Sequence, residues 1–110
     1  MSEDKKYKIF CFDIDGTLAI THGTDYTRCE PQLDMIAIVN RLYDNGHTIK
    51  LITARGYVTK IDWREVTEKQ LSRWGVKYHE LIFGKPNADY YIDDKAVTLE
   101  MIQQLEKQYV

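Results

Sequence analysis

The stretch IFCFDIDGTL, residues 9–18, decides the fold and raises a chemical question. Its first four residues are apolar, and they predict a short buried strand that ends near Asp13. The strand runs directly into two carboxylates, Asp13 and Asp15, after which Gly16 allows a sharp turn. Carboxylates are rarely buried unless they are paired or used, so this pair requires an explanation.

Strands and helices alternate along the rest of the chain. Further strands are predicted at 48–53 (TIKLIT), 80–83 (ELIF) and 90–93 (YYID). Helices are predicted from Pro31 to before Gly46, from Asp62 to before Gly75, and after Thr98, which can cap the last one. In the first helix the spacing i, i+3, i+4, i+7 predicts one apolar stripe, formed by Met35, Ile38, Val39 and Leu42. This order favours an α/β fold with a three-layer, Rossmann-like, doubly wound parallel sheet. Because the strands are apolar throughout, we expect helices to cover both faces of the sheet.

Length and composition limit the classes of protein that fit. The chain has 110 residues, which predicts one domain over 1–110, and its net charge of −2 carries no nucleic-acid signature. The chain has no apolar run of membrane-spanning length, and its polar start has no signal-peptide character. Cys11, expected in the core, and Cys29 form no metal-binding pattern, so we expect reduced thiols and a cytoplasmic protein.

The polar residues of interest follow the predicted strands. They are Asp13 and Asp15 after the first, Thr53, Ala54 and Arg55 after the second, Lys85 after the third, and Asp93 and Asp94 after the fourth. The carboxyl ends of parallel strands meet at one edge, where ligands bind. Clustered carboxylates repel one another, and Mg²⁺ would remove the conflict. A lysine and a hydroxyl beside them suit a phosphate, so the set predicts a phosphoryl-transfer site with a carboxylate nucleophile.

These motifs resemble those of the haloacid dehalogenase superfamily. FDIDGTL resembles the first motif of that family, and LITAR resembles the second through its strand-end threonine. FGKP and YIDDKA resemble the third and fourth, and the four occur in the family's order. The resemblance extends from Asp13 to Asp94, which is most of the chain.

The resemblance implies a role for each position. Asp13 would be the nucleophile and a Mg²⁺ ligand, and Asp15 would be the general acid and base, with its backbone carbonyl on the metal. Thr53, Ala54 and Lys85 would bind the phosphoryl group, while Asp93 and Asp94 would complete the metal site. For Arg55 the sequence itself leaves two roles open, a contact with the substrate beyond its phosphate or an ion pair with a surface acid.

The segment 18–30, expected as an irregular loop or a small hairpin, is too short for the helical cap that many relatives carry. The chain therefore resembles a capless phosphatase, similar to small phosphatases of capsule and polysaccharide biosynthesis. This resemblance favours a sugar phosphate or a polysaccharide precursor as substrate. An open site also suits a larger substrate, or a homo-oligomer in which a neighbouring copy covers it.

Alternative functions stay open. A polynucleotide end or a nucleotide could be the substrate, although the charge argues against nucleic acid. A signalling receiver domain also combines aspartates, threonine and lysine around Mg²⁺, but it has its acidic pair early and a single phosphorylated aspartate in mid-chain. In this chain Asp13 and Asp15 come first and the pair Asp93 and Asp94 comes last, and this order argues against a receiver domain. A phosphate-binding module without turnover is the third possibility.

Overall fold

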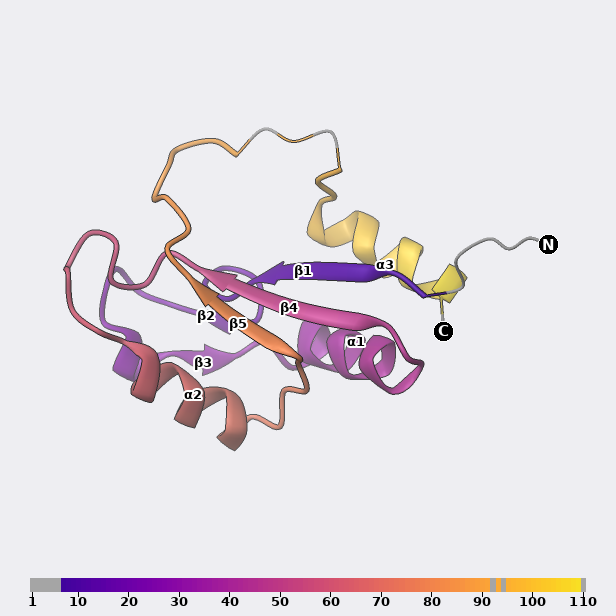
Figure 1. Ribbon diagram of the computed structural model, residues 1–110, viewed down its shortest axis with the longest axis horizontal. Helices are drawn as coiled ribbons and strands as arrows, with labels where there is room; N and C mark the ends of the chain where they lie inside the picture. Colours follow the sequence, from indigo (N-terminus) through magenta and orange to yellow (C-terminus); the bar gives the residue numbers. More distant parts are fainter. Residues whose placement is uncertain (1–6, 92, 94, 110) are drawn as a thin grey trace.

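The computed structural model describes residues 7–91, 93 and 95–109. Its centre is a parallel sheet of three strands in the order β1-β4-β5, with β1 at Ile9–Asp13, β4 at Thr48–Thr53 and β5 at Glu80–Phe83 (Figure 1). All three strands finish at the same end of the molecule. The predicted α/β class with a parallel sheet is confirmed.

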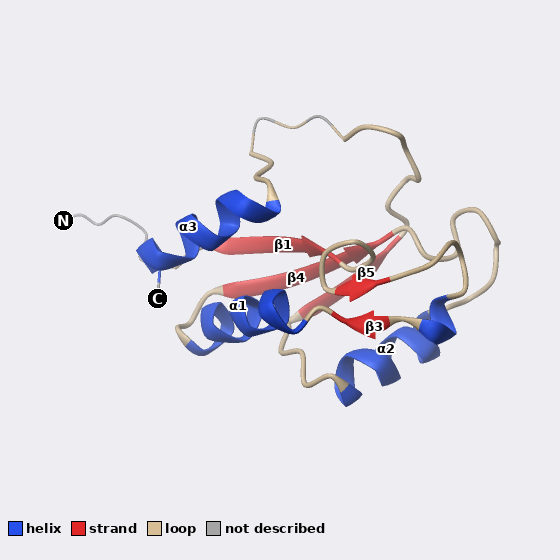
Figure 2. Ribbon diagram, turned by 180° about the vertical axis from the view of Figure 1, so that it is seen from behind, coloured by secondary structure: helices blue, strands red, loops and turns tan. Residues whose placement is uncertain are grey.

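Helices connect and flank the strands (Figure 2). The helix α1 (Leu33–Asp44) joins β1 to β4, α2 (Arg64–Arg73) joins β4 to β5, and α3 (Leu99–Tyr109) follows β5 and contacts α1. The predicted apolar stripe of α1 is buried as expected, at Met35, Ile38, Val39 and Leu42. The hydroxyl of Thr98 accepts the Met101 N–H at 3.1 Å, which is the predicted cap of α3. Within the described ranges, no helix is both long and apolar enough to cross a membrane.

A small hairpin occupies the segment after β1. It consists of β2 (Ala19–Ile20) and β3 (Glu30–Pro31), which pair antiparallel, with the 3₁₀ helix η1 (Tyr26–Arg28) between them. A hairpin was one of the two predictions for this segment, but Pro31 belongs to β3 and not to the first turn of α1. The N–H of Gln32 donates to the Leu18 carbonyl at 2.8 Å, which ties the chain to the hairpin until the helix begins. The described residues contain no cap domain.

The described residues of the predicted fourth strand do not form a strand. Tyr90, Tyr91 and Asp93 have no strand conformation, and Ile92 lies outside the described residues. Tyr90 is 84% exposed and Tyr91 is 51% exposed, so neither side chain is part of the core. Within the described part of the chain, β1 pairs with β4 alone. Apolar residues predict strand character, but a strand also needs a partner for its backbone groups.

The two faces of the sheet differ in burial because successive side chains point to opposite faces. Phe12 and Leu51 are buried on the face that the helices cover. On the other face Ile9 is 65% exposed, Cys11 is exposed, and Lys50 forms an ion pair with Glu80. In the part of the chain that the structure describes, helices therefore do not cover both faces of the sheet, contrary to the prediction. Cys11 lies on the open face and not in the core.

Candidate active site

The ends of the parallel strands bring Asp13 and Lys85 together. Asp13 is the last residue of β1, and Lys85 lies two residues beyond the end of β5. The Lys85 Nζ atom is 3.3 Å from Asp13 Oδ2. The backbone N–H of Lys85 donates to the carbonyl of Thr53 at 3.1 Å, which attaches the loop after β5 to the end of β4. The central strand thus fixes where the lysine stands relative to the carboxylate.

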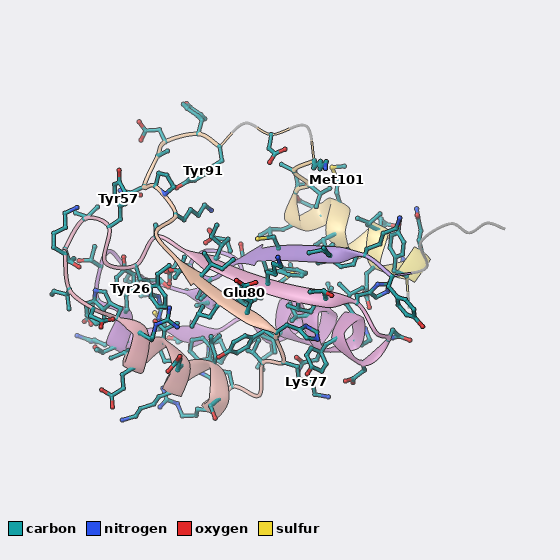
Figure 3. The ribbon with its side chains drawn as sticks, viewed as in Figure 1. Tyr26, Tyr57, Lys77, Glu80, Tyr91 and Met101 are labelled. Atoms are coloured by element: carbon teal, nitrogen blue, oxygen red, sulfur yellow. The ribbon has the colours of Figure 1, made fainter. Side chains whose placement is uncertain are left out.

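A polar pocket of about 380 Å³ opens at this edge of the sheet. It lies between the hairpin, the strand ends and the loop after β5, and Figure 3 shows Tyr26 and Tyr91 at this end of the molecule. Its lining consists of Asp13, Asp15, Gly16, Thr21, Gly23, Tyr26, Ala54, Lys85, Asn87, Ala88 and Tyr91. Four of the predicted site residues, Asp13, Asp15, Ala54 and Lys85, are among them.

Opposing effects act on the pKa of the Asp13 carboxylate. Burial raises its pKa above the ordinary value, and the nearby charge of Asp15 acts in the same direction. Lys85 and the hydrogen bond from the Ile14 N–H, at 2.9 Å, oppose this shift. A further positive charge near Asp13 would favour its ionised form, which is the form that a nucleophile requires.

Asp15 is held by side chains from two other parts of the chain. Its Oδ2 atom accepts from Arg55 Nε at 3.0 Å, and its Oδ1 atom accepts from Arg55 Nη2 at 2.9 Å. The hydroxyl of Thr21, from the hairpin, donates to the same Oδ1 at 2.5 Å. The Asp15 side chain is 26% exposed, and the residue lines the pocket.

Arg55 pairs with an acid and does not contact the pocket. Its side chain is fully buried, and its five N–H groups all have acceptors. Besides the two bonds to Asp15, Nη1 donates to Thr67 at 3.0 Å and to Gln70 at 2.8 Å, both on α2. The last N–H points to Cys29 Sγ at 3.5 Å. Arg55 is not among the residues that line the pocket, so its predicted substrate contact is not seen there. The alternative, pairing with a surface acid, is met only in part, because the partner is Asp15, a carboxylate of the pocket itself.

Thr53 and Ala54 differ in their access to the pocket. Ala54 lines it, whereas Thr53 is fully buried and its hydroxyl accepts the N–H of Arg55 at 3.0 Å. In this structure the Thr53 hydroxyl shapes the turn after β4. Its contact with a phosphate stays a prediction.

The predicted metal ligands are only partly brought together. Asp13 and Asp15 meet at the pocket, but Asp93 is not part of its lining, and Asp94 lies outside the described residues. The Asp93 carboxylate accepts the N–H of Lys95 at 2.9 Å. Among the described residues, no three His, Cys, Asp or Glu side chains form a group that could hold a metal. The two carboxylates present nevertheless supply the oxygen donors that Mg²⁺ prefers.

Several lining residues have no signal in the sequence. Thr21 is joined to Cys29 across the hairpin at 3.2 Å, and only the hairpin's pairing brings the two together. Tyr91 places its ring 4.1 Å from Lys85 Nζ, and the hydroxyl of Tyr91 accepts the N–H of Ala88. Tyr26, from the segment between β2 and β3, lies with its ring centre 4.8 Å from the Arg55 guanidinium.

Comparison with known proteins supports the fold. A structural-genomics target from Vibrio cholerae is similar at 31% identity with a TM-score of 0.76, covering 92% of this chain and 98% of that one. No protein-family model and no curated protein sequence matches the chain.

Chains in two structures of the Pnkp1/Rnl/Hen1 complex, one described as an RNA repair complex, are similar at 24% and 19% identity. Their TM-scores are 0.61 and 0.60, over 86% and 96% of this chain. This chain spans 33% and 32% of theirs, and at these identities the similarity shows the fold alone. The chain therefore has a small Rossmann-like α/β fold, without a cap among the residues that the structure describes.

Proposed function

We propose that the protein is a Mg²⁺-dependent phosphomonoester hydrolase that works through an aspartyl-phosphate intermediate. One observation carries the proposal: Asp13 and Asp15 face one pocket, and Lys85 Nζ is 3.3 Å from Asp13. A nucleophile, a proton donor and a cation for phosphate oxygens are the groups that this reaction requires.

In the first half of the reaction, a carboxylate oxygen of Asp13 attacks the phosphorus atom. The bond between phosphorus and the ester oxygen breaks, and Asp15 gives its proton to the departing oxygen. Lys85 binds the non-bridging oxygens of the phosphoryl group as it moves. The products are a free alcohol and a phosphoryl group on Asp13.

In the second half, a water molecule attacks the same phosphorus atom. Asp15, now ionised, takes a proton from that water, and the bond between phosphorus and the Asp13 oxygen breaks. Inorganic phosphate leaves, and both aspartates return to their starting states. One pocket thus serves both steps.

The proposed cofactor is Mg²⁺. Asp13, the backbone carbonyl of Asp15, Asp93 and Asp94 would hold it, the last of these from outside the described residues. When bound, Mg²⁺ neutralises charge on the phosphoryl group. The residues present suit a bound cation, because burial disfavours the ionised carboxylate of Asp13 and a positive charge beside it would stabilise that form.

A sugar phosphate or a polysaccharide precursor is the proposed substrate class. A pocket of about 380 Å³ has a size suited to a small ester, and a net charge of −2 does not attract polyanions. A polynucleotide end is the second candidate, and the similarity to chains of an RNA repair complex favours it.

The test is phosphate release from a panel of esters, measured with Mg²⁺ and with chelator. The panel contains sugar phosphates, nucleotides, phosphoamino acids and 3′-phosphorylated oligonucleotides. We expect Mg²⁺-dependent release, highest for sugar phosphates. Preference for oligonucleotides would select the second candidate. Absence of release from every ester, by folded and Mg²⁺-loaded protein, would contradict the proposed activity.

Asp13→Asn tests the nucleophile. We expect turnover to be lost while the protein stays folded, since the amide oxygen is a poor nucleophile. Asp25→Asn is the matched control, because Asp25 lies in the hairpin but not in the pocket lining. Retained turnover in Asp13→Asn would remove Asp13 from the mechanism.

A further inference from the structure

The two oxygens of the Asp15 carboxylate have different surroundings. Each carboxylate oxygen can accept two hydrogen bonds. Oδ1 accepts two, from the Thr21 hydroxyl at 2.5 Å and from Arg55 Nη2 at 2.9 Å, whereas Oδ2 accepts Arg55 Nε at 3.0 Å. Among the residues that the structure describes, one acceptor position therefore stays available on Oδ2, and Asp15 lines the pocket.

We propose that Arg55 is a positioning residue that fixes the Asp15 carboxylate so that its Oδ2 atom exchanges the proton with the leaving oxygen and with water. This inference rests on the proposed hydrolase function and adds to it a residue outside the pocket lining. The planar guanidinium and the carboxylate form two parallel hydrogen bonds, which fix both the position and the plane of the acid.

Arg55 is itself held in place. The guanidinium donates to Thr67 and Gln70, which are 0% and 3% exposed and belong to α2. The ring of Tyr26 lies against the guanidinium, and the side chain of Gln70 donates to the backbone carbonyl of Tyr26. A buried arginine with five acceptors has little freedom to rotate. The orientation of Asp15 is thus set by packing between α2, the hairpin and the turn after β4.

Dependence on the leaving group separates positioning from a general structural role. An alkoxide must receive a proton as it leaves, whereas 4-nitrophenolate is stable without one. A misplaced acid should therefore slow attack on benzyl phosphate much more than attack on 4-nitrophenyl phosphate. The value of kcat/KM reports this step, because it covers the reaction up to the first irreversible bond cleavage.

The experiment compares Arg55→Lys with the wild type on these two esters. Lysine keeps the positive charge but cannot form two parallel bonds. We expect kcat/KM for benzyl phosphate to fall about 100-fold, the loss typical of a 1 Å misplacement, and that for 4-nitrophenyl phosphate to fall less than about tenfold. Thr67→Val, which removes one acceptor of Arg55 without touching the pocket, should show the same selectivity with a smaller loss.

Arg41→Lys is the matched control. Arg41 also forms two hydrogen bonds to one carboxylate, that of Glu106, at 2.6 and 3.0 Å, and neither residue lines the pocket. We expect lower stability and an unchanged ratio of the two kcat/KM values. Circular dichroism and thermal unfolding establish which variants are folded. If Arg55→Lys does not fold, the kcat/KM ratio of Thr67→Val decides whether Arg55 positions Asp15.

The outcomes separate the inference from the function on which it rests. A fall in kcat/KM of Arg55→Lys that is much larger for benzyl phosphate than for 4-nitrophenyl phosphate supports the positioning role. Equal losses on both esters, in a folded variant of an active enzyme, would overturn the positioning role and leave the hydrolase intact. Absence of phosphate release by the wild type from either ester and from the whole panel would overturn both.

Discussion

At the scale of single residues, Asp13 links the proposed chemistry to stability. Burial raises the pKa of Asp13 in the folded protein above its value in the unfolded chain. Between those two pKa values the unfolded chain binds fewer protons than the folded one, so the free energy of unfolding falls as the pH rises. Asp13 therefore destabilises the metal-free protein at neutral pH, and this effect vanishes at a pH below the ordinary range for aspartate.

Asp13→Asn should reveal this cost. In the presence of chelator, we expect the variant to be more stable than the wild type at neutral pH, with the difference shrinking as the pH falls below the ordinary aspartate pKa. Urea unfolding followed by the fluorescence of Trp63 and Trp74 measures it at each pH. A difference that does not change with pH would show that Asp13 titrates alike in both states.

At the scale of elements, the contact between α1 and α3 depends on a half-buried ion pair. The side chain of Glu106 on α3 is 7% exposed, whereas that of Arg41 on α1 is 53% exposed. Arg41→Ala leaves the Glu106 carboxylate without its two donors, and we expect a loss of about 1–3 kcal/mol in the free energy of unfolding.

An exposed ion pair provides the comparison. Lys77 and Asp44 are 2.8 Å apart, but their side chains are 48% and 57% exposed. Lys77→Ala should cost about 0–1 kcal/mol, because water replaces the lost partner. Equal losses for Arg41→Ala and Lys77→Ala in urea titrations would show that burial of Glu106 has no energetic consequence.

The turn after β4 depends on one glycine. Gly56 has φ of +86°, and a Cβ atom there would lie 2.6 Å from the carbonyl oxygen of Ile61. Gly75 has a similar φ of +71° with nothing within 4 Å of such a Cβ. Gly75→Ala should cost about 1–2 kcal/mol from the left-handed conformation, and Gly56→Ala should cost more. The two melting temperatures measure the difference, and equal values would show that the Ile61 carbonyl moves aside freely.

At the scale of the whole molecule, the sheet has a well-protected centre and an open edge. β4 pairs on both sides, with β1 and with β5. We therefore expect slow hydrogen exchange at the amides of Leu51 and Ile52, and fast exchange at Tyr90 and Tyr91, which have no strand conformation. Hydrogen exchange read by NMR tests this. Slow exchange at Tyr90 and Tyr91 would show that this segment pairs as a strand in solution.

Local patterns in the sequence were sufficient for most elements. The apolar spacing of Met35, Ile38, Val39 and Leu42 predicted the buried side of α1, because a helix repeats every 3.6 residues. The segment 90–93 looks equally apolar but forms no strand in its described residues, since pairing depends on a neighbour that no local pattern specifies. Pro31 failed as a helix start for a similar reason, because the hairpin holds it.

By itself, the sequence determined the α/β order, the parallel strands and the carboxylates and lysine that follow their ends, because these depend on period, turn residues and chain order. Only the tertiary structure decided which of these side chains meet. It brought Lys85 to Asp13, buried Arg55 against Asp15, and joined Thr21 to the same acid. Such contacts join parts of the chain far apart in sequence, and they form only when the packing of α2 and the hairpin fixes the positions of their side chains.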